Sequence, residues 1–248
     1  CLKERPAHIN IQSNTMLGLL TFTCSVVCLL PQAYSNKLRL AALEVPGFIF
    51  LWCLGAQRKG MVISMKNLNI LFAGFGGQGV LFAGKVVAYA ALIANKQLSW
   101  LPSYGPEMRG GTANCSVCVS DEAIGSPLVT NPNVFIAMNL PSFDKFINAV
   151  EPGGVVIVDS SLIDKKVERD DVTVYYVPST SLADENGVNG LSNMILIGKL
   201  FKEVCMADGD YKFCDEDILD QAVQKCIPAR KAQMLDFNRK AIQIGQEQ

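Results

Sequence analysis

Apolar positions in the middle of the chain change from a short continuous run to a helical pattern across a glycine-rich turn. Residues 69–73 are typical of a buried strand, and residues 80–91 carry apolar side chains on most of a helix surface. Between them stands the segment Gly74-Phe75-Gly76-Gly77-Gln78-Gly79. A strand, a glycine turn and a helix in this order form the opening unit of a doubly wound α/β domain. Such a turn directs free backbone N–H groups and the positive end of a helix dipole to one point, where an anion can bind.

The pattern after this unit predicts further strands and helices in alternation. Strands are expected at residues 97–101, 112–119, 134–138, 155–158 and 172–177, and helices at 143–150, 192–204, 215–226 and 229–244. Apolar strands that alternate with helices favour a mostly parallel sheet with helices on both faces. The sequence therefore predicts a doubly wound, Rossmann-like α/β fold with extra C-terminal helices, formed by one domain from residue 65 to residue 248.

The segment 1–64 differs in composition from the rest. It contains six Lys or Arg and two Asp or Glu, against 16 and 21 in residues 65–248, and it begins with Cys1. Its two apolar stretches are shorter than the roughly 20 residues that cross a bilayer. We interpret it as poorly structured, translated upstream sequence, with Met65 or alternatively Met61 as the biological start. A secretory signal or anchor, which its early basic residues and apolar run imitate, and an ordinary additional segment are the alternatives.

Side chains that usually carry catalysis or bind metals are scarce after residue 64. The single histidine of the chain is His8, which excludes a histidine-based triad or metal site from residues 65–248. Cys115 and Cys118 form a C-x-x-C pair, but residues three apart on a strand point to opposite faces and do not share a metal. The other three cysteines of this part are irregularly spaced and are typical of thiols in a reducing compartment. We therefore expect no metal site in this chain and a cytoplasmic protein.

Two further classes of function lack their signatures. The thiamine diphosphate motif, Gly-Asp-Gly followed further along by Asn, is absent, since residues 208–210 read Asp-Gly-Asp. Basic residues such as Lys145, Lys165 and Arg169 are scattered and outnumbered by acids, so the chain has no electrostatic footprint for nucleic acid. Amphipathic C-terminal helices more often complete a fold than bind a membrane. We expect neither nucleic acid nor a membrane among the partners.

The glycine turn leaves three interpretations open. Gly74, Gly76 and Gly79 match G-x-G-x-x-G, but the dinucleotide fingerprint also requires an acidic residue about 20 positions further on. Residues 66–106 contain no Asp or Glu, which disfavours a nicotinamide site. The glycines then serve tight packing of the strand against the helix, or they admit a phosphate-bearing ligand or a partner subunit.

A polar loop follows the predicted strand at 97–101. Residues 102–111 place Ser, Tyr, Glu and Arg among glycines and a proline, beyond the carboxyl end of a strand, where binding groups of open α/β sheets collect. Arg109, followed by two glycines, is suited to hold a phosphate or carboxylate with two hydrogen bonds. In the alternative interpretation Arg109 pairs with Glu107 and the loop packs against a neighbour. Residues 139–142 are expected to face the same side.

The two motifs together resemble a known family. The glycine turn and the later segment Ser103-Tyr104-Gly105-Pro106-Glu107-Met108-Arg109-Gly110-Gly111-Thr112-Ala113-Asn114-Cys115 are similar to the gamma subunit of 2-oxoacid:ferredoxin oxidoreductases. The similarity extends from about Met65 to Val204. The segment Ser-Tyr-Gly-Pro-Glu-Met-Arg-Gly-Gly is similar to the one found in the branch of this family that acts on 2-oxoglutarate or branched-chain 2-oxoacids.

This resemblance implies a function within a heteromeric complex. The complex oxidatively decarboxylates a 2-oxoacid with coenzyme A (CoA), yielding acyl-CoA, carbon dioxide and reduced ferredoxin. Thiamine diphosphate and iron–sulfur (4Fe-4S) clusters are implied on the alpha, beta and ferredoxin-like delta subunits, so the isolated chain is expected to be inactive. The chain itself is expected to complete the active site and to help hold CoA, through Gly74, Gly76, Gly77, Gln78, Gly79, Ser103, Tyr104, Glu107, Arg109 and Gly110. A stand-alone nucleotide-binding module or dehydrogenase, and a purely structural subunit, are the alternatives.

Overall fold

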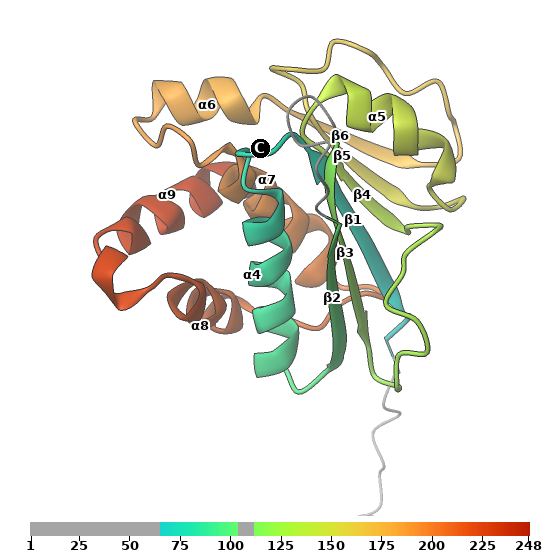
Figure 1. The fold of residues 1–248 in the computed structure, drawn as a ribbon, viewed down its shortest axis with the longest axis horizontal. Coiled ribbons are helices and arrows are strands. Elements are labelled where there is room, and N and C mark those ends of the chain that lie inside the picture. The colour runs from blue at the N-terminus through green and yellow to red at the C-terminus, as the bar shows by residue number, and fades with distance from the viewer. Residues whose placement is uncertain (1–64, 104–111) are drawn as a thin grey trace, which may run out of the picture. The chain divides into compact units, whose positions relative to one another are not determined.

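Six strands pair into one sheet, seen in a computed structural model that describes residues 65–103 and 112–248 (Figure 1). The strands are β1 (Leu68–Gly74), β2 (Gln97–Ser103), β3 (Ala113–Ser120), β4 (Val134–Ala137), β5 (Val155–Asp159) and β6 (Thr173–Val177). Their order in the sheet is β2-β3-β1-β4-β5-β6. All six were expected from the apolar runs, with ends that differ by at most two residues.

The sheet is mostly parallel, as predicted, with one reversed strand. β1, β4, β5 and β6 pair in parallel, whereas β3 is antiparallel to both of its neighbours, β1 and β2. Only nine residues connect β2 to β3. A parallel neighbour needs a crossover of about a dozen residues or more, so a connection of this length favours reversal. The carboxyl ends of β1, β2, β4, β5 and β6 consequently lie on one edge of the sheet, called here the carboxyl edge.

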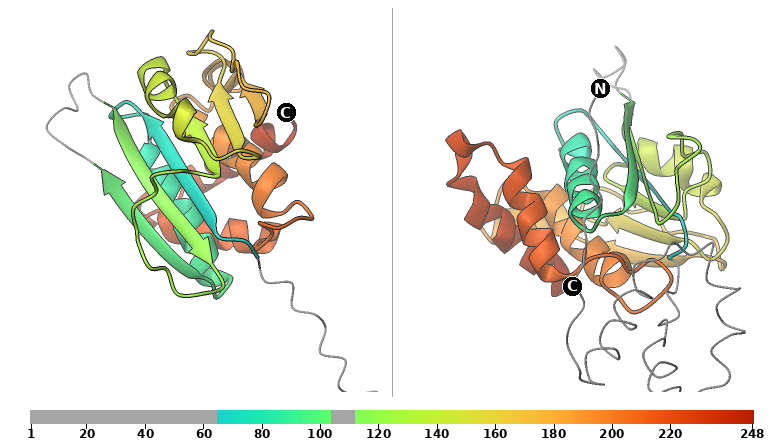
Figure 2. Two further views of the ribbon diagram at one scale, coloured as in Figure 1. Left: turned by 90° about the vertical axis from the view of Figure 1, so that its right-hand side faces the viewer. Right: turned by 90° about the horizontal axis from the view of Figure 1, so that it is seen from below.

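Helices cover both faces of the sheet, as predicted. On one face lie α4 (Val80–Ile93), α7 (Ser192–Leu200), α8 (Glu216–Cys226) and α9 (Met234–Gln246), and α5 (Leu140–Phe146) lies on the other (Figures 1 and 2). Two apolar cores result. Phe72 and Ile136 point into the core under α4 and α7, and their neighbours Leu71 and Phe135 point into the core under α5. This alternation along β1 and β4 is the expected pattern for strands that are buried on both faces.

Several helix boundaries differ from those expected. α5 begins at Leu140 rather than residue 143, because the Asn139 side chain accepts a hydrogen bond from the Ser142 N–H (2.9 Å) and so caps the helix earlier. A 3₁₀ turn, Ile147–Ala149, completes the predicted segment. The short helix α6 (Ser179–Glu185) was not predicted, since seven residues give too little helical periodicity to recognise.

The C-terminal helices show two more differences. α7 continues as a π-helical segment, Phe201–Cys205, and the last predicted helix splits into a 3₁₀ turn, Ala229–Lys231, and α9. The start of α8 agrees with expectation: Asp215 caps it by accepting from the Ile218 N–H at 2.8 Å. Within the described ranges, none of the helices has the length and apolar character needed to cross a membrane.

Candidate functional site

The glycine turn joins β1 to α4 at the carboxyl edge. β1 ends at Gly74 and α4 begins at Val80, with Gly77 at φ 96° and Gly79 at φ 77°. Both angles lie in the left-handed region that residues with a Cβ rarely adopt. Gly79 has a second constraint, because a Cβ there would lie 2.5 Å from Nδ2 of Asn193 on α7. Gly76, by contrast, has no positive φ, so its backbone conformation does not by itself require glycine.

The N-terminus of α4 is open. No side chain caps it, and its first turn contains no acidic residue. The first intrahelical bond is donated by the Ala83 N–H to the Gly79 carbonyl (2.9 Å), which leaves the preceding N–H groups of the helix without helical partners. Gly76 and Gly77, just before the helix, are exposed. The helix dipole and these donors make a position suited to an anion.

Gln78 connects the turn to the neighbouring strand. Its Oε1 accepts from the Phe75 N–H (2.6 Å), and its Nε2 donates to the carbonyl of Met138, just beyond β4 (2.8 Å). From β1 the chain continues to β2 and β3, which lie on one side of β1 in the sheet, and only then to β4, which lies on its other side. The strand order therefore reverses between β1 and β4, and Gln78 bridges this point. Ligands of open α/β sheets bind in the crevice at such a point. Gln78 was expected to bind ligand, but here its side chain holds the turn in place.

The end of β4 faces the same crevice, as predicted for residues 139–142. Asn139 and Ser142 are buried at 2% and 0% exposure, and Asn139 caps α5. Among the described residues, Asn139 Nδ2 and Ser142 Oγ have no hydrogen-bond partner. Buried polar groups are normally paired, so these two atoms are exceptions just below the surface of the carboxyl edge.

Polar groups also follow β5 and β6. Asp159, 1% exposed, accepts from the Thr180 hydroxyl (2.6 Å) through Oδ2 and from the Ser161 N–H (3.0 Å) through Oδ1. The Ser181 hydroxyl and N–H both donate to Ser161 Oγ at 3.1 Å. These bonds tie the ends of the two strands together. Asp159 directly follows the strand expected at residues 155–158, and an acid in this position is itself a signal for the carboxyl edge.

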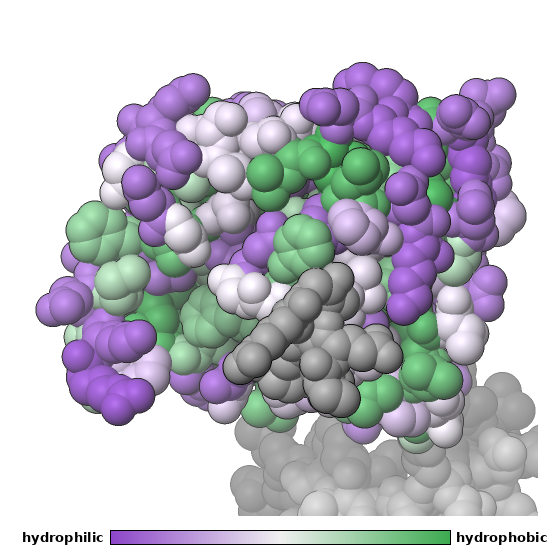
Figure 3. Space-filling view, turned by 45° about the horizontal axis from the view of Figure 1, so that its top comes forward, coloured by the Kyte–Doolittle hydropathy of each residue, from purple (hydrophilic) through white to green (hydrophobic). Residues whose placement is uncertain are grey.

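Large apolar side chains are exposed along the carboxyl edge. Phe75, Leu140 and Leu162, which follow β1, β4 and β5, are 40%, 41% and 45% exposed. In the view that brings this edge forward, apolar side chains gather between hydrophilic ones (Figure 3). An exposed apolar cluster with a polar border is typical of a surface that contacts a partner or a ligand.

The structure brings together half of the expected site residues. Gly74, Gly76, Gly77, Gln78 and Gly79 form the turn, and Ser103 ends β2, two strands away from β1. The remaining four candidates, Tyr104, Glu107, Arg109 and Gly110, lie outside the described residues. Asn193, whose Nδ2 donates to the Gly79 carbonyl at 3.3 Å, was not predicted, because it belongs to a segment more than a hundred residues away in sequence.

The two thiols of the C-x-x-C pair, Cys115 and Cys118, point away from each other. Cys115 packs toward Gly84 of α4, whereas Cys118 is on the other face and contacts the Ser126 carbonyl, as the strand geometry predicted. Burial raises the pKa of Cys115 to about 12 and also raises that of Cys118. In the part of the chain that the structure describes, no three His, Cys, Asp or Glu side chains are grouped as metal ligands would be.

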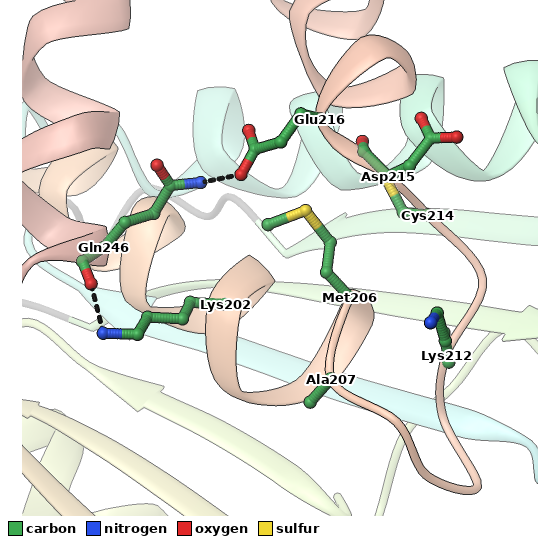
Figure 4. A pocket seen from close by; sticks show the side chains of 8 residues that line it. All are labelled: Lys202, Met206, Ala207, Lys212, Cys214, Asp215, Glu216 and Gln246. Atoms are coloured by element: carbon green, nitrogen blue, oxygen red, sulfur yellow. Dashed lines mark hydrogen bonds between the residues drawn. The ribbon is translucent and has the colours of Figure 1, made fainter.

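A cavity of about 510 Å³ lies away from this edge, near the start of β1 (Figure 4). Its charged side chains already have hydrogen-bond or ion-pair partners. Gln246 donates through Nε2 to Glu216 Oε1 (2.8 Å) and accepts from Lys202 through its carbonyl, and Lys212 pairs with Asp208 (2.6 Å). Size alone would favour this cavity, but the unpaired donors lie at the carboxyl edge, and we place the candidate site there.

Known proteins share this sequence and fold. Residues 69–248 match the family described as pyruvate ferredoxin/flavodoxin oxidoreductase. A ketoisovalerate oxidoreductase subunit VorA from Methanothermobacter marburgensis is 36% identical over 180 residues, which are 73% of this chain and 36% of the relative. A 2-oxoglutarate synthase subunit KorC from Methanocaldococcus jannaschii is 38% identical over 135 residues, 53% of this chain and 72% of the relative. This chain thus spans only about a third of the length of VorA.

A solved structure extends the likeness to the whole described fold. The keto/oxoacid ferredoxin oxidoreductase gamma subunit from Geobacter sulfurreducens has a TM-score of 0.60 and 27% identity, over 73% of this chain and 96% of that one. A pyruvate-flavodoxin oxidoreductase from Klebsiella pneumoniae is only 24% identical over 192 residues, which agrees with a resemblance to the 2-oxoglutarate and branched-chain branch. The matched residues include the glycine turn, the sheet and the C-terminal helices, and the chain belongs to the pyruvate ferredoxin/flavodoxin oxidoreductase family.

Proposed function

We propose that this chain acts as the gamma-type subunit of a cytoplasmic 2-oxoacid:ferredoxin oxidoreductase complex. The reaction converts a 2-oxoacid, CoA and oxidised ferredoxin into acyl-CoA, carbon dioxide and reduced ferredoxin. Relatives named for ketoisovalerate and 2-oxoglutarate support a 2-oxoglutarate or branched-chain substrate. The gamma subunit from Geobacter sulfurreducens, which this chain covers almost completely, supports the role within the complex.

The redox groups are proposed to belong to partner subunits. Iron–sulfur clusters are held by thiolates, but all five described cysteines are buried, and desolvation raises their pKa values. The cysteines of the described residues therefore do not fit a cluster. We assign thiamine diphosphate and the 4Fe-4S clusters to alpha, beta and ferredoxin-like delta subunits, and we expect the isolated chain to be catalytically inactive.

This chain's own task is proposed to be the binding of CoA at the carboxyl edge. The observation that carries this proposal is the open N-terminus of α4 beside the end of β4, where free N–H groups and a positive dipole end face the crevice. CoA carries phosphate groups that suit this position. Within the sequence motif, Ser103, Tyr104, Glu107, Arg109 and Gly110 are proposed to extend the same site.

A dehydrogenase is less compatible with the strand order. In dinucleotide-binding folds an acidic residue about 20 positions after the glycine turn holds the ribose. Here the corresponding strand, β2, ends at Ser103 and is separated from β1 by the antiparallel β3. A purely structural role in the complex has one observation in its favour, the exposed Phe75, Leu140 and Leu162 at the carboxyl edge.

Arg109→Ala tests the proposed site in the assembled complex. Loss of a charge-assisted phosphate contact should raise the Michaelis constant for CoA about tenfold or more. Melting of the complex and its subunit composition should stay unchanged, because substitutions of surface residues usually alter stability by no more than about 0.5 kcal/mol. Steady-state kinetics measure the Michaelis constant, thermal denaturation measures the melting, and size-exclusion chromatography measures the subunit composition.

Gly76→Val provides a second variant at the turn. Because Gly76 has no positive φ, a branched side chain there tests the approach of a ligand rather than backbone strain. It should also raise the Michaelis constant for CoA. Should either variant prevent the subunits from associating while CoA kinetics stay normal, the purely structural role is correct.

A further inference from the structure

The two faces of the β2–β3 pair differ in chemistry. On the face under α4, Trp100 pairs with Val117, and Val117 belongs to the apolar core. On the opposite face, Ser103 pairs with Asn114, and Leu101 pairs with Ser116. An antiparallel pair commonly has one face packed on a core and one polar face toward solvent, and the second face of β2 and β3 follows this pattern, with Ser103 exposed and Asn114 half-buried. Polar groups are therefore available on this face.

A cavity of about 370 Å³ lies over this polar face. Its floor is formed by β1, β2 and β3 through Leu71, Leu101, Ser103, Asn114 and Ser116. Lys145 and Phe146 of α5 line one side, and Leu128 and Val129, from the β3–β4 connection, line another. The cavity thus combines polar groups on its floor with side walls that are apolar except for Lys145.

The polar groups of the floor are available for binding. Within residues 65–103 and 112–248, the side chains of Ser103, Asn114 and Ser116 make no hydrogen bond. Ser116 is 4% exposed as a residue, and it lines the cavity. A bound group that reaches the cavity floor can therefore replace water as the partner of this hydroxyl.

Lys145 adds a positive charge beside the cavity. Its ammonium lies 3.5 Å from Thr112 Oγ1 and 5.1 Å from the ring centre of Phe146, and it forms no ion pair with a described carboxylate. The nearby Lys165, by contrast, is paired with Asp144 at 2.7 Å. Thr112 directly precedes Ala113, which pairs with Gly74. The contact of Lys145 with Thr112 therefore lies at the same end of the sheet as the glycine turn, on the strand next to β1.

We propose that Lys145 and this cavity form a second anion-binding subsite, which takes a phosphate group of the same CoA molecule. This inference rests on the proposed function. CoA carries a diphosphate and a separate 3′-phosphate, so one molecule can present phosphate both to the N-terminus of α4 and to Lys145. The hydroxyl and amide groups of the floor suit the polar parts of the nucleotide, and Leu101 and Phe146 suit its uncharged parts.

The test compares Lys145→Ala with Lys225→Ala in the assembled complex. Lys225 is a matched control because it is an exposed lysine of α8, on the other face of the sheet, and has no ion pair with a described residue. The Michaelis constant is measured with CoA and with 3′-dephospho-CoA. Lys145→Ala should raise the constant for CoA about tenfold at unchanged kcat, and Lys145→Arg should restore most of it, whereas the control should have no effect.

The second substrate identifies the phosphate. If the effect of Lys145→Ala disappears with 3′-dephospho-CoA, the ammonium binds the 3′-phosphate, and if it persists, the ammonium binds the diphosphate; both results support the subsite. An unchanged constant for CoA in Lys145→Ala, with a raised constant in Arg109→Ala, overturns the subsite and leaves the proposed function intact. Unchanged constants in both variants overturn both. Loss of subunit association in Lys145→Ala assigns this residue to an interface and also overturns the subsite.

Discussion

The polar groups after β1 and after β5 lie on the same edge of one sheet but are arranged in opposite ways. After β5, the Asp159 carboxylate is 1% exposed, and its two oxygens accept from Ser161 and Thr180. After β1, Gly76 and Gly77 are exposed, and the first N–H groups of α4 have no helical partner. The polar groups after β5 thus bond to each other, whereas the N–H groups after β1 are left without helical partners.

This difference separates a polar group that serves the fold from one that can serve a ligand. A buried carboxylate with satisfied bonds is costly to disturb and has little capacity left for another partner. Free N–H groups at an open helix N-terminus keep that capacity. If the comparison is correct, substitutions at the β5 end should change stability without changing CoA binding. Substitutions at the glycine turn should change both stability and CoA binding, and more strongly the more they disturb the geometry of the turn.

The largest effect is expected for Asp159→Ala. It removes a buried acceptor and leaves the Thr180 hydroxyl and the Ser161 N–H without their partner, so the free energy of unfolding should fall by about 3 kcal/mol. Urea denaturation measures the change, and CoA kinetics of the folded complex should stay normal. Asp144→Ala is the matched control, since it breaks only an exposed ion pair and should change stability little. A lost CoA response at unchanged stability would contradict the structural role of Asp159.

Two glycines of the turn should differ in a measurable way. Gly79→Ala combines a left-handed backbone angle with a Cβ 2.5 Å from Asn193 Nδ2, and we expect a loss of about 2 kcal/mol in unfolding free energy. Gly77→Ala has the same sign of φ but open space around its Cβ, so about 1 kcal/mol is expected. Thermal denaturation of both variants gives the difference. In a double-mutant cycle, adding Asn193→Ala to Gly79→Ala should remove the extra loss of stability that Gly79→Ala shows over Gly77→Ala. Equal losses in the two single variants would show that the contact with Asn193 is unimportant.

Gln78→Ala is expected to change stability as little as Gly77→Ala does. The variant loses the bonds to the Phe75 N–H and the Met138 carbonyl, and since the site is partly exposed, stability should fall by about 1 kcal/mol. The turn should also become less well positioned, which we expect to raise the Michaelis constant for CoA by roughly threefold. Gln221→Ala on the exposed side of α8 is the control, and it should change neither quantity. An unchanged constant in Gln78→Ala would show that the bridge to β4 does not position the binding groups.

The sequence predicted the fold well where the pattern is local. The run 69–73, the glycines and the apolar surface of residues 80–91 specify a strand, a turn and a helix through neighbours in the chain, and the structure contains all three. The short α6 was missed and the start of α5 was misplaced for a related reason. A seven-residue helix has little periodicity, and the position of a cap depends on a single side chain, Asn139.

The candidate site was predicted less completely. The turn was identified by its glycines, but Asn193, Thr180 and Lys145 give no local signal, because each acts on a segment that is distant in the sequence. Lys145 was seen only as one of several scattered basic residues. Its proposed role in anion binding depends on the absence of an ion pair with a described carboxylate, which only the structure shows.

By itself, the sequence determined the class of fold, the family resemblance and the presence of a glycine turn before a helix. The spacing of apolar residues, the glycine positions and the helix polarity are properties of contiguous residues. Only the tertiary structure decided the direction of β3, the bridge from Gln78 to Met138, and the closed network around Asp159. These features arise when strands far apart in the chain become neighbours, and whether a polar group there is satisfied or free depends on the partners that this pairing brings to it.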